Sequence, residues 1–282
     1  MNNFKNSSVF DIIQYYTCYL KEHNIENAKF ESELILCELL TCNKIDLYTK
    51  TQPINKIDFN LISEYINRRI KGEPIQYILE KAYFYGNQFK VNPHVLIPRF
   101  DSEVLIDILK KYRCVNDLLD VGTGSGNLAI TIAKEQLANN IIATDISEKQ
   151  LKIAKYNNHN IYPEKTIHFI VDDFLNSNLN QKFDIIVSNP PYIPKNELKN
   201  LDGTVKNHEP KNALTDGGDG YSFYRQFAKL GPHLLKDNGS IFLEIGINNS
   251  PTMLKNIFND YKINIFNDLD NIARIIQLDL TV

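Results

Sequence analysis

The chain has 282 residues, with 31 Lys and Arg against 34 Asp and Glu, so its formal net charge is −3. Hydrophobic residues make up 43% and charged residues 23% of the sequence, which allows a full core and excludes a disordered, collagen-like or disulfide-stapled chain. The near-neutral balance lacks the basic footprint of a nucleic-acid-binding protein, and no apolar run approaches the roughly 18 residues of a membrane helix, so we expect a cytoplasmic protein with neither partner.

The first 75 residues are predicted to form a small helical bundle. Ser8 is placed to cap a first helix, whose apolar residues recur at helical spacing, and a second helix runs from about residue 27 to 40. A third covers about residues 56 to 71 and is stopped by Gly72 and Pro74.

From residue 76 to 98 the apolar period changes. Alternating residues on either side of Gly86-Asn87 predict a β-hairpin or a short extended linker. We therefore divide the chain into a helical domain at 1–75, a hairpin linker at 76–98 and a larger domain at 99–282.

Strands and helices alternate through the larger domain. The predicted strands cover residues 116–121, 140–145, 166–171, 183–188, 239–245, 262–267 and 273–280, and the main helices cover 126–137, 148–158 and 221–235. This alternation predicts an α/β fold with a doubly wound, mostly parallel, seven-stranded Rossmann-like sheet. Ligands of such sheets bind at the carboxyl ends of the strands.

A glycine-rich loop follows the first of these strands and opens a helix. It reads Asp120-Val121-Gly122-Thr123-Gly124-Ser125-Gly126. Glycines let the backbone approach a ligand closely, and Asp145 at the end of the next strand is placed to accept from two ribose hydroxyls.

The spacing of that loop departs from the Gly-x-Gly-x-x-Gly of dinucleotide sites. It resembles the first motif of S-adenosylmethionine-dependent methyltransferases, so the loop and Asp145 are candidate S-adenosyl-L-methionine contacts. A tight turn without a ligand and an NAD site are the alternatives. Asp172 and Asp173, after the third strand, stand where such enzymes contact the adenine, and they also suit a helix cap. The scattered cysteines and histidines predict no metal site.

The fourth strand ends at Asn189-Pro190-Pro191-Tyr192. Two prolines can simply end a strand, but this motif resembles the catalytic signature of enzymes that methylate planar nitrogens. An amide nitrogen is a poor nucleophile because its lone pair is delocalised. The Asn189 side-chain carbonyl and the Pro190 backbone carbonyl can accept its N–H bonds and aim it at the methyl donor, while Tyr192 offers a flat face.

Further segments are similar to the release factor glutamine methyltransferase, or HemK-type, family. The first segment is Gly72-Glu-Pro-Ile-Gln76-Tyr77, and shortly after it Glu80 stands in place of a usual glycine. The second is Ile97-Pro98-Arg99-Phe100-Asp101-Ser102-Glu103, in which Ser102 replaces a threonine. The others are His208-Glu209-Pro210 and the glycine-rich residues 213–220. The resemblance implies that Arg99 and Glu103 lie near the methionine end of the cofactor and that Glu209 contacts the substrate. The glycine-rich composition of 213–220 predicts a mobile loop near the acceptor site that serves as a lid. Residues 270–274 depart from the family pattern.

The resemblance implies methyl transfer to the glutamine amide of the Gly-Gly-Gln motif in class 1 peptide chain release factors, with the N-terminal helices as a docking surface. One alternative is an N6-adenine methyltransferase of DNA or RNA, which shares Asn-Pro-Pro-Tyr but would favour a basic chain with a target-recognition domain. Another is a non-catalytic S-adenosylmethionine-binding partner of the translation machinery, which would not need Asn189.

Overall fold

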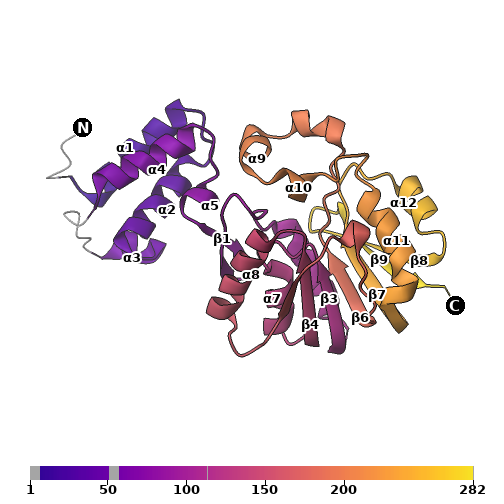
Figure 1. Ribbon diagram of the computed structural model, residues 1–282. Helices are drawn as coiled ribbons and strands as arrows, with labels where there is room; N and C mark the ends of the chain where they lie inside the picture. The colour runs from indigo at the N-terminus through magenta and orange to yellow at the C-terminus, as the bar shows by residue number, and fades with distance from the viewer. Residues whose placement is uncertain (1–6, 51–56, 113, 282) are drawn as a thin grey trace. The chain divides into compact units, whose positions relative to one another are not determined.

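The computed structural model describes residues 7–50, 57–112 and 114–281. The chain divides into two compact units, Met1–Glu80 and Lys81–Val282 (Figure 1). The hairpin that follows the helices belongs to the second unit. No helix within the described ranges is both long and apolar enough to cross a membrane.

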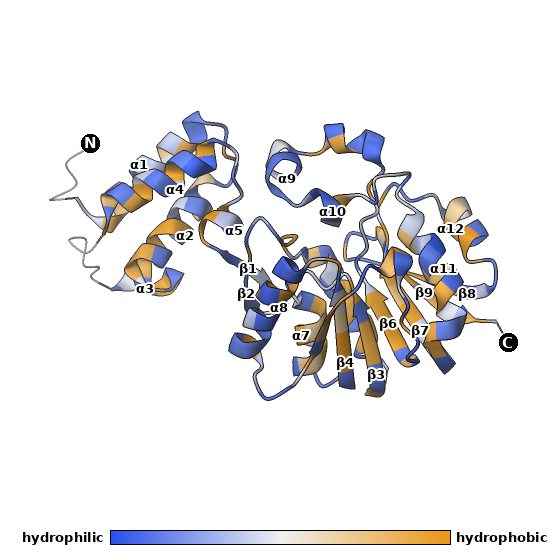
Figure 2. Cartoon of the chain, viewed as in Figure 1, coloured by the Kyte–Doolittle hydropathy of each residue, from blue (hydrophilic) through white to orange (hydrophobic). Residues whose placement is uncertain are grey.

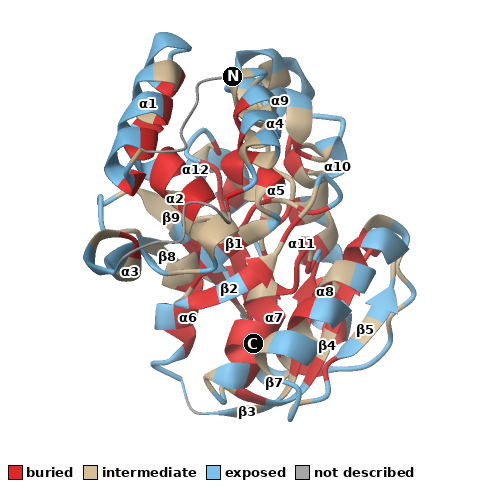
Figure 3. Ribbon diagram, turned by 90° about the vertical axis from the view of Figure 1, so that its left-hand side faces the viewer, coloured by how far each residue is buried: buried red, intermediate tan, exposed pale blue. Residues whose placement is uncertain are grey.

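The first unit is helical, as predicted. Its helices are α1 Val9–Glu22, α2 Ala28–Leu40, α3 Lys44–Thr49, α4 Phe59–Ile70 and α5 Ile75–Ile78. Ser8 and Asp11 form a reciprocal capping box at the start of α1, which confirms the predicted cap. The buried face of α1 packs on α2 and α4, and Figure 3 shows it as a stripe along one side of the helix. Residue 56, the predicted start of the third helix, lies outside the described residues.

Two short helices of this unit are absent from the prediction. Asn43 caps α3 by accepting from the Asp46 backbone N–H at 2.8 Å. Helix α5 follows Pro74 and runs into the segment where an extended chain was expected, so that prediction is wrong at residues 76–78. Proline presets the backbone for the first turn of a helix, and a single turn is too short to show an apolar period.

The predicted hairpin is present, with its turn displaced by one residue. Strands β1 Lys81–Phe84 and β2 Asn87–Lys90 pair antiparallel, with Phe84 opposite Asn87. The turn is therefore Tyr85-Gly86, with φ of 48° and 72°, and not Gly86-Asn87. Two left-handed residues match the twist of a two-residue hairpin. Asn87 instead donates to the Tyr85 carbonyl at 3.0 Å.

A seven-stranded sheet in the order β5-β4-β3-β6-β7-β9-β8 forms the second unit, and it confirms the predicted fold class. The strands are β3 Val115–Val121, β4 Ala138–Asp145, β5 His168–Val171, β6 Phe183–Ser188, β7 Leu235–Glu244, β8 Tyr261–Asn267 and β9 Ala273–Leu280. All neighbours are parallel except β9, which pairs antiparallel with both β7 and β8.

Helices cover both faces of this sheet (Figure 1). The described helices are α6 Glu103–Leu109, α7 Asn127–Lys134, α8 Glu148–Ile161, α9 Gly203–His208, α10 Lys211–Leu214, α11 Ser222–Leu234 and α12 Pro251–Ile257. Leu118 belongs to one core cluster with α6 and α7, and its neighbour Leu119 belongs to the other with α11 and α12. The central strands are therefore apolar on both faces, and Figure 2 shows these strands as mostly hydrophobic along their length.

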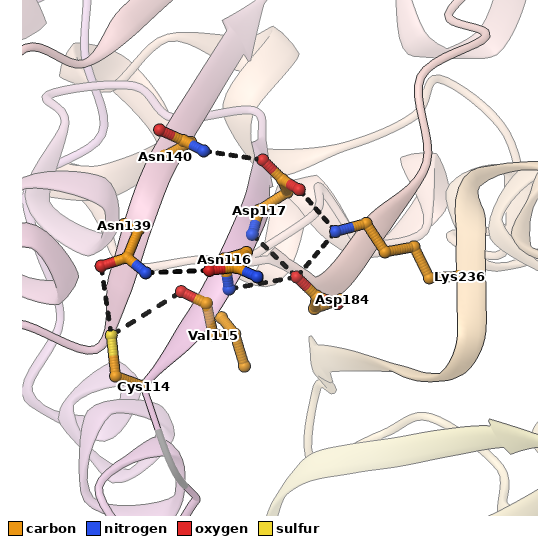
Figure 4. Close-up of polar contacts among 8 residues, drawn as sticks. All are labelled: Cys114, Val115, Asn116, Asp117, Asn139, Asn140, Asp184 and Lys236. Carbon is orange, nitrogen blue, oxygen red and sulfur yellow. Dashed lines mark hydrogen bonds and ion pairs between the residues drawn. The ribbon is translucent and has the colours of Figure 1, made fainter.

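The amino ends of the central strands carry a polar cluster instead (Figure 4). Lys236 forms ion pairs with Asp117 of β3 and, at 3.0 Å, with Asp184 of β6. Asp184 also accepts the backbone N–H of Asp117 at 2.8 Å. These groups tie β3, β6 and β7 together at the end of the sheet opposite the candidate site.

Candidate functional site

A cavity of about 250 Å³ lies at the carboxyl ends of the parallel strands. Its lining includes Gly122 after β3, Asp145 at the end of β4, Asp172 after β5 and Asn189 after β6. Strand β3 is central, and the chain winds through β4 and β5 on one side and through β6 and β7 on the other. The cavity thus sits at the topological switch point, where open α/β sheets bind ligands.

The register of β3 and β6 brings the two sequence motifs together. Val121 is paired with Ser188, so the glycine loop and the Asn-Pro-Pro-Tyr segment leave the sheet side by side. The Ser188 hydroxyl donates to the Val121 carbonyl at 2.7 Å and holds this junction.

Open space lies in front of the glycine loop. Gly122 and Gly124 have φ of +72° and +54°, and a Cβ added to either would meet nothing within 4 Å. The Gly122 and Thr123 backbone N–H groups donate to the Thr144 carbonyl at 2.9 and 2.8 Å. The backbone is therefore held from behind, and the cavity side of the loop is free for a ligand.

The other predicted residues of this loop lie behind it and build its shape. Buried Asp120 accepts from the Thr123 hydroxyl at 2.7 Å and from the Ala129 backbone N–H at 3.2 Å. The Ser125 hydroxyl donates to Asn127 at 3.1 Å. Gly126 begins α7 with φ of +82° and packs against α8. None of these side chains is among the cavity lining.

Acidic groups line the opposite side of the cavity. Asp145 accepts the backbone N–H of Gly124 at 2.9 Å and that of Ser147 at 3.1 Å, one on each carboxylate oxygen. Each oxygen keeps a second lone pair. Burial raises the pKa of Asp145 despite those bonds.

Asp172 and Asp173 have different surroundings. One carboxylate oxygen of Asp172 is buried without a hydrogen-bond partner, and Asp172 lines the cavity. Asp173 also lines it, but its carboxylate accepts from the Leu175 backbone and from Asn176 at 3.2 and 2.7 Å, as a cap. Phe174 is buried against Phe227. Asp172 is thus the residue of this segment with an acceptor to spare.

Asn189 is held through its amide nitrogen. Asn189 Nδ2 donates to Ser102 Oγ at 3.1 Å, and Ser102 in turn donates to a carboxylate oxygen of Glu244. Pro191 lines the cavity beside Asn189, whereas Pro190 is buried and is not part of the lining.

Tyr192 is anchored by its hydroxyl. It donates to the second carboxylate oxygen of Glu244 at 3.2 Å, and its ring lies against Gly246, where an added Cβ would be 2.6 Å from the ring edge. Burial, followed by the nearby Glu244 carboxylate, raises the pKa of Tyr192.

The glycine-rich segment 213–220 is tied to the acceptor motif. Ile193 and Lys195 donate backbone bonds to the Leu214 and Gly218 carbonyls at 3.0 and 2.9 Å. Within the segment, Asp216 accepts the backbone N–H groups of Gly218, Gly220 and Ser222 at 2.8–3.0 Å. These bonds connect the segment that is predicted to be a mobile lid to the acceptor motif.

Three residues assigned from the family resemblance lie outside the cavity lining. Arg99 donates to buried Glu209 at 2.7 Å, so these two residues pair with each other. Burial raises the pKa of Glu209, and the Arg99 charge opposes that rise. Glu103 accepts the Tyr85 backbone N–H at 2.7 Å and thereby caps the hairpin turn.

Several residues at this site were not identified from the sequence. Gln150, Asn212, Asp216 and Phe223 line the cavity, and Ser102 and Glu244 support Asn189. Glu244 was recognisable in principle, because it is a carboxylate at the carboxyl end of a strand. The described residues form no cluster of three or more His, Cys, Asp or Glu that could hold a metal ion.

The fold and site define a methyltransferase. Residues 99–236 match the methyltransferase small domain family. The sheet is similar to that of a methyltransferase from Pyrococcus furiosus, at 17% identity and a TM-score of 0.51 over 78% of this chain and 100% of that one.

Residues 11–79 match the PrmC N-terminal domain. The release factor glutamine methyltransferase of Fusobacterium nucleatum is 39% identical over 90% of this chain and 73% of its own length, and that of Bacillus subtilis is 36% identical over 85% of each chain. The chain therefore belongs to the release factor glutamine methyltransferase family, which confirms the resemblance drawn from its motifs.

Proposed function

We propose that this chain transfers a methyl group from S-adenosyl-L-methionine to the side-chain amide nitrogen (N5) of the glutamine in the Gly-Gly-Gln motif of class 1 peptide chain release factors. Family membership supports the substrate, since the relatives that match most of the chain carry that name. The observation that carries the chemistry is Asn189, whose amide nitrogen is engaged by Ser102 so that its carbonyl oxygen is left for an acceptor at the cavity.

The cavity has the features that S-adenosyl-L-methionine requires. Gly122 and Gly124 leave open space along the loop, Asp145 retains lone pairs for ribose hydroxyls, and Asp172 has a buried, unpartnered oxygen for an exocyclic amino group. When bound, the cofactor supplies an activated methyl group on a sulfonium. The proposed contacts are therefore Gly122, Gly124, Asp145 and Asp172, with Asp120, Thr123, Ser125 and Gly126 shaping the loop.

Asn189 would act on the acceptor by orientation. Its carbonyl oxygen accepts one N–H bond of the target amide and stabilises the positive charge that develops on the nitrogen during transfer. The second N–H bond is assigned from the motif to the Pro190 backbone carbonyl, although Pro190 is buried outside the cavity lining. As the methyl–nitrogen bond forms, the methyl–sulfur bond breaks to leave a neutral thioether, and the nitrogen then loses one proton to water. No side chain of the motif needs to hold that proton, so most of the rate gain comes from alignment of the two bound reactants.

The helical unit would dock the release factor. Residues 11–79 match the PrmC N-terminal domain, and they belong to a different compact unit from the methyltransferase core. A cytoplasmic location follows from a substrate that acts in translation. Methylation of adenine N6 is less well supported, because the formal charge is −3 and the curated relatives are named for release factors.

The test combines a substrate comparison with one substitution. With labelled S-adenosyl-L-methionine, we expect label in a purified release factor, at its Gly-Gly-Gln peptide, and none in duplex DNA or tRNA. Asn189→Ala should keep cofactor affinity, measured by calorimetry, and lose transfer. Asn139→Ala, at the opposite end of the sheet (Figure 4), is the matched control and should retain both. Label in nucleic acid alone, or full transfer by Asn189→Ala, would overturn the proposal.

A further inference from the structure

Asn189 is connected through buried groups to a single carboxylate. Ser102 Oγ receives the Asn189 amide N–H at 3.1 Å and donates its own proton to Glu244. The other oxygen of Glu244 receives the Tyr192 hydroxyl at 3.2 Å. Ser102 and Glu244 are each only 1% exposed, so water does not compete for these bonds.

The direction of these bonds is determined by chemistry. An ionised carboxylate can only accept, and a serine hydroxyl has one proton. Because the single O–H group of Ser102 donates its hydrogen bond to Glu244, the Ser102 oxygen can only accept a hydrogen bond from Asn189. The amide must then turn its Nδ2 toward Ser102, which leaves its oxygen for the other side. A free asparagine has no such preference, because its two ends have nearly the same shape.

We propose that Ser102 and Glu244 are positioning residues for methyl transfer. Glu244 sets, through Ser102, which end of the Asn189 amide faces the acceptor, and it holds the ring of Tyr192 directly. One buried carboxylate at the end of β7 thus aligns two residues of the acceptor motif that follows β6. The inference rests on the proposed function, since an acceptor N–H is what the oriented oxygen would receive.

The surroundings of Glu244 allow this role. Arg274 lies near it and is bonded to Asp101 and Asp268, each at 2.8 Å, while the Tyr224 hydroxyl donates to the Glu244 backbone carbonyl at 2.9 Å. Burial raises the pKa of Glu244 to about 7; the Ser102 and Tyr192 bonds lower it, Asp101 raises it further and Arg274 lowers it. Protonation of Glu244 would let it donate to Ser102 and would remove the bias on Asn189.

The first test is a serine series. Ser102→Ala should lower kcat by about 10- to 100-fold, the range expected for a misaligned catalytic group, and leave cofactor affinity within about threefold. Ser102→Thr keeps the hydroxyl and should restore kcat to within about threefold. The matched control is Ser240→Ala, which removes another buried serine hydroxyl that donates to a carboxylate, that of Asp279 at 2.6 Å. It should leave kcat unchanged.

The second test concerns the carboxylate. Wild-type kcat should fall as the pH drops below about 7, and Glu244→Gln should have a lower kcat without that limb, because a neutral amide does not titrate. A Ser102→Ala enzyme as active as the wild type would overturn the inference, as would a Ser102→Thr enzyme as slow as Ser102→Ala.

A measurement without turnover separates this inference from the proposed function. The side-chain amide signals of Asn189, identified by their loss in Asn189→Ala, should show a protected N–H in the wild type and in Ser102→Thr and an unprotected one in Ser102→Ala. If the wild type does not methylate a release factor but these signals behave as described, the substrate proposal fails and the positioning role stands. Identical protection in all three proteins overturns the positioning role.

Discussion

Gly220 is the position where the contact between residues 213–220 and the Asn-Pro-Pro-Tyr motif can be tested most directly. It has φ of +83°, and a Cβ there would fall inside the contact distance of the Tyr192 carbonyl oxygen, 3.0 Å from the carbonyl carbon and 3.2 Å from the Pro194 nitrogen. These are backbone atoms, so they cannot swing aside as a flexible side chain would. Gly220→Ala must therefore displace the segment that carries Asn189 and Tyr192.

The cost has two parts. A left-handed conformation costs an alanine about 1–2 kcal/mol, and overpacking against a fixed neighbour adds about 1–3 kcal/mol. The variant Gly217→Ala separates the cost of backbone strain from the cost of overpacking. Gly217 has φ of +77° in the same segment, but a Cβ added there would meet nothing within 4 Å. Both variants gain the same small entropic benefit of replacing glycine. The difference between their free energies of unfolding should therefore be about 1–3 kcal/mol.

Urea unfolding of both variants measures that difference, and methylation kinetics measure its effect on the motif. We expect Gly220→Ala to be the less stable variant and to lose kcat, whereas Gly217→Ala keeps wild-type kcat. Equal stability of the two variants, together with full activity of Gly220→Ala, would refute the close contact on which this reasoning depends.

Three further substitutions test other parts of the molecule. Burial raises the pKa of Asp120 from 3.8 to about 7, so its ionisation lowers the free energy of unfolding as the pH rises between those two values. Relative to the wild type, Asp120→Asn should therefore gain about 3 kcal/mol in the free energy of unfolding between pH 5 and pH 8, and parallel urea-unfolding free energies across that range would contradict this. Glu80 has φ of 53°, a left-handed conformation that glycine adopts without strain, so Glu80→Gly should raise the free energy of unfolding by about 1 kcal/mol. Glu80→Ala is the control that gains nothing from relief of strain. Ser8→Ala should lose about 1 kcal/mol by removing the capping box, and an unchanged thermal midpoint would show that the cap contributes nothing.

The positions in the fold that the sequence predicted correctly are those encoded by neighbouring residues. The glycine loop, Asp145 and Asn189 each follow a strand with a clear apolar run, and parallel strands bring their carboxyl ends to one edge. The fold class followed from the same alternation. The hairpin turn was wrong by one residue, because the choice between Tyr85-Gly86 and Gly86-Asn87 depends on strand register and not on composition.

Long-range pairs were beyond such reasoning. Ser102 and Glu244 are separated by 142 residues, and nothing local in either segment indicates that they meet. Arg99 and Glu209, assigned separately to cofactor and substrate, form an ion pair across 110 residues. In both cases the two partners lie far apart in the sequence, so their contact could be found only once the chain was folded.

The placement of β9 limits how this protein can be shortened or assembled. It follows β8 in the chain but lies between β7 and β8 in the sheet, and β8 pairs with no other strand. Deleting residues 273–280 would therefore remove β9 and separate β8 from the rest of the sheet. It would also uncover the edge of β7, whose last residue is Glu244. During synthesis, completion of the sheet beside Glu244 must accordingly wait for the segment that begins at Ala273.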